Sequence, residues 1–97
     1  MEFKTEFGRV TVEVSEYTNN GRVALILNDA ETGEQVTVLT VNLPDATLEE
    51  GEFAVKDWTE NKSIARDALA SGYFVDTGKR IATGFVQAPV WRLKGGN

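Results

Sequence analysis

Residues 10–43 read VTVEVSEYTNNGRVALILNDAETGEQVTVLTVNL, and this stretch decides the fold. Its first five residues, 10–14, alternate strictly between valine and a polar residue, which is typical of a strand with one buried face. Asn20 and Gly21 favour a tight hairpin turn, because both residue types tolerate the positive φ that such turns need. The apolar run 23–27 then predicts a central strand.

A second turn and a third strand complete this pattern. Asp and Gly in residues 28–33 predict the turn, and the strand is expected over 36–43. Its apolar positions change parity between Val38 and Leu39, so the strand has either a bulge or apolar cover on both sides. The three strands are expected to form an antiparallel meander that ends at Pro44.

The following region predicts one short helix. Residues 45–60 form an acidic connection, in which 53–55 are expected to make a short edge strand. Asn61 is the expected N-cap of a helix near 61–71, and Gly72 is its expected C′ glycine. One helical face carries four apolar residues, Ile64, Ala65, Ala68 and Leu69.

Strand pieces are expected after the helix at three places, 73–75, 81–85 and 90–93. Residues 77–80 predict a turn, and Pro89 is expected to interrupt the strand that contains it. Residues 94–97 are expected to be a disordered tail. Six aromatic residues are expected in the core or on a sheet face: Phe3, Phe7, Tyr73, Phe74, Phe85 and Trp91.

Together these elements predict an α+β fold in a single domain over residues 1–97. The expected architecture is a mainly antiparallel sheet of five to six strands, with the meander at its N-terminal side and one short helix against a face. The chain has 97 residues. That length is enough for one hydrophobic core.

The composition argues against several functions. The chain has no cysteine and no histidine, so it lacks a thiolate, the commonest general base and the commonest zinc ligand. The net charge of −5 argues against direct binding to nucleic acid or to an anionic membrane. No apolar run approaches a membrane span, and the first residues do not resemble a signal peptide, so we expect a cytoplasmic protein.

Few residues are arranged as a known catalytic or metal-binding motif. Asp29, Glu31 and Glu34 offer oxygen ligands, but their spacing is typical of a hairpin turn and not of a calcium loop. Residues 78–80 place a glycine before two bases without a phosphate-binding pattern. We therefore expect no metal, no cofactor and no enzymatic activity. A hydrolase that uses two carboxylates is the enzyme class left open.

Acidic and basic residues are concentrated in different parts of this sequence. Residues 45–60 hold six acidic residues and one lysine, whereas residues 61–97 hold two acidic and six basic residues. Trp58 lies inside the acidic segment, and no apolar periodicity demands its burial. One interpretation is a solvated loop that keeps the protein soluble, with Trp58 folded over the core.

The other interpretation is an interface at which carboxylates steer a basic protein partner and Trp58 anchors the contact. In its strongest form the carboxylates imitate a short row of phosphates on a nucleic acid. The candidate partner-binding residues are Glu49, Glu50, Glu52, Asp57, Trp58 and Glu60.

Four motifs also resemble a known family. They are F-x-x-x-F-G at 3–8, Tyr17 before the Asn-Asn-Gly of 19–21, LTVNLPD at 39–45, and SGYFVDTGKRIATGFVQAPVWRL at 71–93. They are similar to a domain-of-unknown-function family of small proteins encoded on bacterial phages, plasmids and conjugative elements. The resemblance implies an inhibitor of a host defence protein that handles nucleic acid, of the anti-CRISPR or anti-restriction type, and it implies no functional residue.

One further function stays open. An accessory or structural protein of a mobile element would self-associate as a homodimer, with the acidic middle of one copy meeting the basic C-terminal third of another, and would have no inhibitory role.

Overall fold

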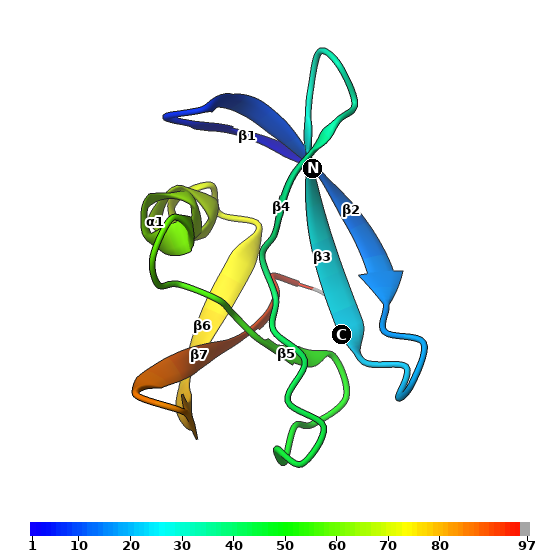
Figure 1. Ribbon diagram of the computed structural model, residues 1–97, viewed down its shortest axis with the longest axis vertical. Coiled ribbons are helices and arrows are strands. Elements are labelled where there is room, and N and C mark those ends of the chain that lie inside the picture. Colours follow the sequence, from blue (N-terminus) through cyan, green and yellow to red (C-terminus); the bar gives the residue numbers. More distant parts are fainter. Residues whose placement is uncertain (96–97) are drawn as a thin grey trace.

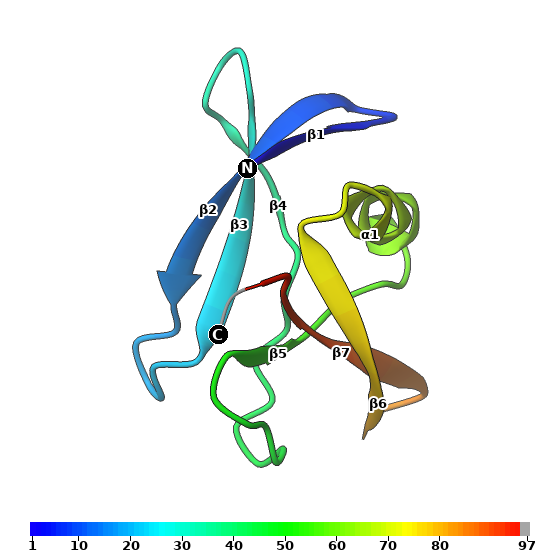
Figure 2. The ribbon, with the colours of Figure 1, turned by 180° about the vertical axis from the view of Figure 1, so that it is seen from behind.

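A computed structural model describes residues 1–95 and divides their strands between two antiparallel sheets (Figures 1 and 2). The first sheet has the order β1-β2-β3-β4 and the second has the order β5-β7-β6. The strands are β1 (Glu2–Thr5), β2 (Gly8–Glu16), β3 (Val23–Asp29), β4 (Gln35–Val38), β5 (Glu52–Ala54), β6 (Phe74–Thr83) and β7 (Val86–Leu93), and the helix is α1 (Asn61–Ala70). The α+β class is confirmed, but the expected single sheet of five to six strands is two sheets.

The first sheet contains the predicted meander. β2 pairs with β3 in an unbroken antiparallel register from Val10 opposite Asp29 to Glu16 opposite Val23. β1 extends the meander at its N-terminal edge. It turns into β2 at Gly8, whose φ of 105° suits a glycine. The Thr5 hydroxyl closes this turn by donating to the Gly8 carbonyl at 2.9 Å.

The predicted third strand, 36–43, is wrong over its second half, because the chain leaves the first sheet after Val38. Leu39 donates its N–H to the Leu25 carbonyl of β3 and accepts from Lys56 with its own carbonyl, each at 2.8 Å. Leu39 is fully buried between the two sheets. The irregular register lies instead in β3, between Leu27 and Asn28. The change of parity at Leu39 therefore marks the point where the chain passes from one sheet to the other.

The helix is confirmed, but the predicted N-cap is wrong. Glu60 holds the N-cap position, and its side chain makes no capping hydrogen bond. Asn61 is the first helical residue and is completely buried. Its Oδ1 accepts from the Thr37 hydroxyl at 2.9 Å, and its Nδ2 donates to the Val38 carbonyl at 3.1 Å. A buried amide needs such partners, so Asn61 ties the start of α1 to β4.

The end of the helix follows the prediction. Ser71 is the C-cap, and Gly72 has a φ of 86° as the C′ residue. Ile64, Ala65 and Ala68 are buried on the predicted apolar face. The fourth residue of that face, Leu69, is 37% exposed. The buried face of α1 is therefore narrower than the apolar face that the sequence predicts.

The second sheet contains a long hairpin, and two predictions about it are wrong. Residues 77–80 are not a chain-reversing turn but an irregularity inside β6, where the register shifts between Asp76 and Arg80. The chain reverses at residues 84–85. Pro89 lies within a continuous β7 opposite Arg80, next to the shift. A proline has no N–H to donate to a ladder, and the irregular stretch of β6 places it where the pairing is already disturbed.

One hydrophobic core serves both sheets and the helix. Phe74 packs edge-on against Phe53, with ring centroids 6.2 Å apart, and lies 5.7 Å from the ring of Trp91. The core cluster consists of Phe3, Val10, Leu25, Leu27, Leu39, Phe53, Val55, Ile64, Ala65, Ala68, Phe74 and Trp91. The expected core placement is wrong for Phe7 and Phe85, which lie in turns and are exposed, and Tyr73 is partly exposed.

The expected disorder of residues 94–97 is only partly covered by the structure. The Lys94 N–H donates to the Tyr73 carbonyl at 2.9 Å, which ties the chain to the start of β6. Residues 96–97 lie outside the described residues.

Candidate functional site

β5 divides the acidic segment into two parts. We call residues 43–51, before β5, the acidic loop, and residues 57–60, before α1, the helix-entry segment. The acidic loop projects at one end of the molecule, whereas the helix-entry segment leads away from β5 toward α1 (Figure 1). The chain advances by five residues from Glu52 to Asp57, and five residues of extended chain span roughly 17 Å. The candidate residues before β5 and those after it therefore do not converge on one point.

The backbone of the acidic loop is held by a neighbouring arginine. The Arg22 guanidinium donates to the carbonyls of Leu43 and Ala46, both at 2.6 Å. Lys79 of β6 adds a longer contact to the Thr47 carbonyl, at 3.5 Å. Glu49 and Glu50 are exposed on this loop, and among residues 1–95 neither has an ion-pair partner. The loop therefore presents its carboxylates from a fixed backbone.

Glu52 has a different position from its two neighbours. Its side chain is only 9% exposed and forms an ion pair with Lys79 at 2.6 Å. The same carboxylate accepts the Glu49 N–H at 3.0 Å. The Lys79 hydrogen bond and then the Glu49 N–H hold the pKa of Glu52 below its usual range. Glu52 thus braces the acidic loop from inside.

The helix-entry segment is partly covered. Asp57 and Trp58 are half-buried, and Glu60 is exposed with Lys56 at 3.7 Å from its carboxylate. The backbone N–H of Glu60, the Thr59 hydroxyl and then Lys56 lower the pKa of the Glu60 carboxyl. Thr59 has a positive φ of 55 degrees, which is unusual for a β-branched residue. This strained backbone turns the chain from the second sheet into α1.

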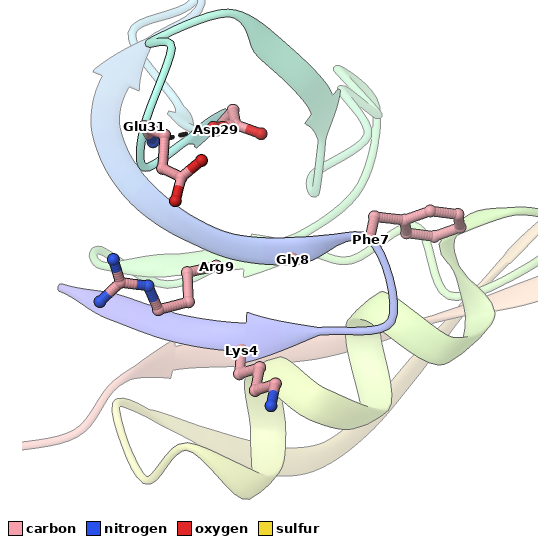
Figure 3. A pocket seen from close by; sticks show the side chains of 6 residues that line it. All are labelled: Lys4, Phe7, Gly8, Arg9, Asp29 and Glu31. Atoms are coloured by element: carbon pink, nitrogen blue, oxygen red, sulfur yellow. Dashed lines mark hydrogen bonds between the residues drawn. The ribbon is translucent and has the colours of Figure 1, made fainter.

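A hollow of about 400 Å³ lies elsewhere, between the β1–β2 turn and the β3–β4 turn (Figure 3). Its side chains do not converge: Lys4 points toward the helix, away from the carboxylates of Asp29 and Glu31, and Phe7 lies at the opposite end (Figure 3). Asp29 accepts the N–H groups of Thr32 and Glu31, which lower its pKa. These bonds are those of a turn, as predicted for the carboxylates at 29–34.

A second hollow, of about 290 Å³, lies between α1 and the β6–β7 hairpin. Arg80 bridges both oxygens of Asp76 at 3.0 Å inside it. The Asp76 carboxylate and then the charge of Asp57 raise the pKa of Arg80, and Arg80 lowers the pKa of Asp76. Trp91 also lines this hollow, and its buried Nε1 has no hydrogen-bond partner in the described chain.

Sequence reasoning missed the residues that hold the candidate surface in place. Arg22 and Lys79 contact residues of the acidic loop that are 21 or more positions away in the sequence. No local sequence pattern predicts such contacts. Across residues 1–95, no group of three or more acidic, histidine or cysteine side chains is arranged to hold a metal ion.

No protein-family model matches this chain, and neither does any curated protein or solved structure. The resemblance to the mobile-element family therefore stays a prediction. Over the described residues, no helix combines the length and the apolar character that crossing a bilayer requires.

Proposed function

We propose that this protein is a non-enzymatic binding protein whose acidic loop contacts a basic surface of another protein. Following the resemblance, the partner is a host defence protein that handles nucleic acid, such as a CRISPR effector or a restriction nuclease. The protein would come from a mobile genetic element and act in the cytoplasm of the bacterial host.

The observation that carries this proposal is the braced acidic loop. Asp45, Glu49 and Glu50 are exposed and lack ion-pair partners in residues 1–95. The backbone beneath them is held by Arg22 and, through Glu52, by Lys79. A charged loop that is already ordered loses less conformational entropy on binding, which favours affinity.

None of the four carboxylates with a resolved pKa shift is suited to be the general acid of a carboxylate-based enzyme. A general acid in such an enzyme needs a raised pKa. The four carboxylates with a resolved shift, Asp29, Glu52, Glu60 and Asp76, all have lowered pKa values.

The six candidate residues take different roles in this proposal. Glu49 and Glu50 steer and contact the partner, and Asp45 joins them from the same loop. Glu52 positions the loop. Asp57, Trp58 and Glu60 form a second, smaller contact region before α1, with Trp58 half-buried.

The proposal is tested by measuring DNA cleavage by a panel of purified CRISPR effectors and restriction nucleases as this protein is titrated. We expect stoichiometric inhibition of at least one of them, weakening as salt is raised. The triple variant Asp45→Lys, Glu49→Lys, Glu50→Lys should weaken inhibition about tenfold or more. A matched variant, Glu16→Lys, Glu31→Lys, Glu34→Lys, makes the same change of charge at exposed positions outside the loop.

Equal weakening by the two triple variants would mean that net charge alone acts, and the loop assignment would be wrong. Absence of inhibition across the panel, together with no salt-sensitive partner from lysates of bacteria that carry these systems, would reject the inhibitory role. The second candidate function, a self-associating accessory protein without inhibitory role, is favoured by Phe85, which is completely exposed at the tip of the β6–β7 hairpin.

A further inference from the structure

The hollow between α1 and the β6–β7 hairpin combines buried apolar side chains with charged ones. Ala65, Pro89 and Trp91 line it and are buried, and the partly exposed Leu69 adds apolar surface from the last turn of α1. Sites for small molecules are typically lined in this way, by apolar side chains and a few polar groups that orient the ligand. An apolar cavity of about 150 Å³ holds a benzene molecule. A hollow of about 290 Å³ therefore has room for one aromatic ring and a polar substituent.

One buried polar group of this lining has no partner. Trp91 is 2% exposed, and its Nε1–H finds no acceptor among residues 1–95. An indole nitrogen is a donor only, and a buried donor without an acceptor costs free energy. The side chain packed on Trp91 is the ring of Phe74, which offers no oxygen. Because Trp91 lines the hollow, an acceptor atom of a bound molecule would supply the missing hydrogen bond.

Two bases of the lining are not engaged by the protein. Lys62 and Arg66 of α1 are exposed, and neither forms an ion pair among residues 1–95. They stand four residues apart, so their side chains are neighbours on one side of the helix. An oxyanion between them would receive charge-assisted hydrogen bonds from both.

The other charged residues of the lining do not neutralise these two bases. Arg80 bridges both oxygens of Asp76 at 3.0 Å. After Asp76, the charge of Asp57 is a further cause of the raised pKa of Arg80, so the two acids share this one base. The lining therefore holds three bases and two acids, a net charge of +1, in a chain whose net charge is −5. This balance favours a ligand with a negative charge.

We propose that this hollow binds a small organic anion that carries an oxyanion group on an apolar body about the size of one ring. Lys62 and Arg66 hold the oxyanion, and the Trp91 N–H donates to an acceptor atom of the ligand. Aryl carboxylates and aryl phosphate monoesters share this chemistry. The inference does not rest on the proposed inhibitory function, because none of these three residues is assigned to the defence partner.

The test follows the indole N–H resonances of the two tryptophans by NMR, with Trp58→Phe to assign them. Benzoate or phenyl phosphate is added to the full chain at constant ionic strength up to about 10 mM, which reaches weak binding. We expect a saturable shift of the Trp91 resonance with a Kd of about 1 mM or below. The anion that binds more tightly assigns the ligand to carboxylates or to phosphate monoesters.

Two control compounds separate the charge from the ring. Benzyl alcohol has the ring without the charge, and acetate has the charge without the ring. Each should bind at least about tenfold more weakly than benzoate, because each loses one of the two kinds of contact.

Variants at exposed positions test the two bases without disturbing the core. Lys62→Gln with Arg66→Gln should weaken benzoate binding about tenfold or more, because both charge-assisted contacts are lost. Lys4→Gln with Arg92→Gln is the matched control, since it removes the same two types of charge from exposed positions outside this hollow. It should change the Kd by less than about twofold, because salt screens distant charges.

A Trp91 resonance that neither anion shifts overturns the proposal. Benzyl alcohol or acetate binding as tightly as benzoate also overturns it, because the site would then not require both the charge and the ring. Equal weakening by the two double variants would mean that net charge alone acts, and the assignment to this hollow would be wrong.

Discussion

The two sheets of this protein are built in different ways. In the first sheet every strand pairs with its neighbour in the sequence, through short turns. In the second sheet β5 pairs with β7, and α1 and β6 lie between them in the chain. The first sheet has the regular alternation of Val10, Val12 and Val14, whereas the second has a three-residue strand and a proline inside a strand. Local pairing leaves a pattern in the sequence, and pairing across a helix does not.

The irregular sheet nevertheless carries three of the four aromatic side chains of the core cluster, the fourth being Phe3 of β1. Phe53, Phe74 and Trp91 come from β5, β6 and β7, whereas β2 and β3 contribute valine and leucine. The two sheets are joined where the chain passes between them at Leu39, and α1 is tied to the first sheet where Asn61 reaches β4. The two sheets therefore differ in how their strands are connected but share one core, and both should unfold together.

The largest expected effect comes from Phe53→Ala in the second sheet, which should lower the free energy of unfolding by about 3–5 kcal/mol. Because Phe53 packs in a core shared with β2 and β3, the first sheet should lose the same stability. Urea unfolding followed by circular dichroism and tryptophan fluorescence should give coincident transitions, as should the matched Leu25→Ala in the first sheet. Two separate transitions would mean that the sheets are independent units.

Asn61→Ala tests the tie between the start of α1 and β4. It should lower the free energy of unfolding by about 2 kcal/mol, because the Val38 carbonyl and the Thr37 hydroxyl lose a buried partner. Asn61→Ser should cost a similar amount, although serine is a good N-cap. A neutral Asn61→Ser would instead support the capping role. Lys62→Ala, at an exposed neighbouring position, should stay within about 0.5 kcal/mol of the wild type.

A smaller effect is expected where the acidic loop meets the second sheet. The pKa of Glu52 is lowered from its ordinary value of 4.5, so its ionised form stabilises the fold. That contribution is present above about pH 4.5 and is lost as the pH falls through the lowered pKa. Glu52→Gln should cost no more than about 1 kcal/mol at pH 7, because Lys79 is partly exposed, and less in acid. Denaturant unfolding across pH 3–7 measures this, with the exposed Glu50→Gln as the control; equal costs at all pH values would contradict it.

The smallest expected effect concerns the turn from the second sheet into the helix. Thr59 has a positive φ, and asparagine tolerates this left-handed conformation better than a β-branched residue. Thr59→Asn should raise the free energy of unfolding by about 0.5 kcal/mol. Thr47→Asn, at a loop position, should leave it unchanged. A loss of stability with Thr59→Asn would mean that the Thr59 hydroxyl, which donates to the Trp58 carbonyl at 2.7 Å, outweighs the strain.

The candidate site shows the same division as the fold. The acidic character of residues 45–60 is evident in the sequence, and Glu49 and Glu50 are exposed in the structure. Neither the inward position of Glu52 nor the braces from Arg22 and Lys79 could be predicted, because these contacts join residues far apart in the chain. The tip at Phe85 was expected inside the strand 81–85, although Gly84 before it is a residue type that favours turns and has a φ of 63° in the structure.

The sequence by itself determined the class of fold, the N-terminal meander, the helix and its glycine stop, because each follows from a local periodicity or from one residue's backbone preference. The tertiary structure decided where the chain changes sheets, why Asn61 is buried, and why Pro89 can stand inside a strand. These features depend on partners that become neighbours only after folding. A buried polar group or a missing donor is tolerated only where such a partner, or an already irregular strand, happens to lie.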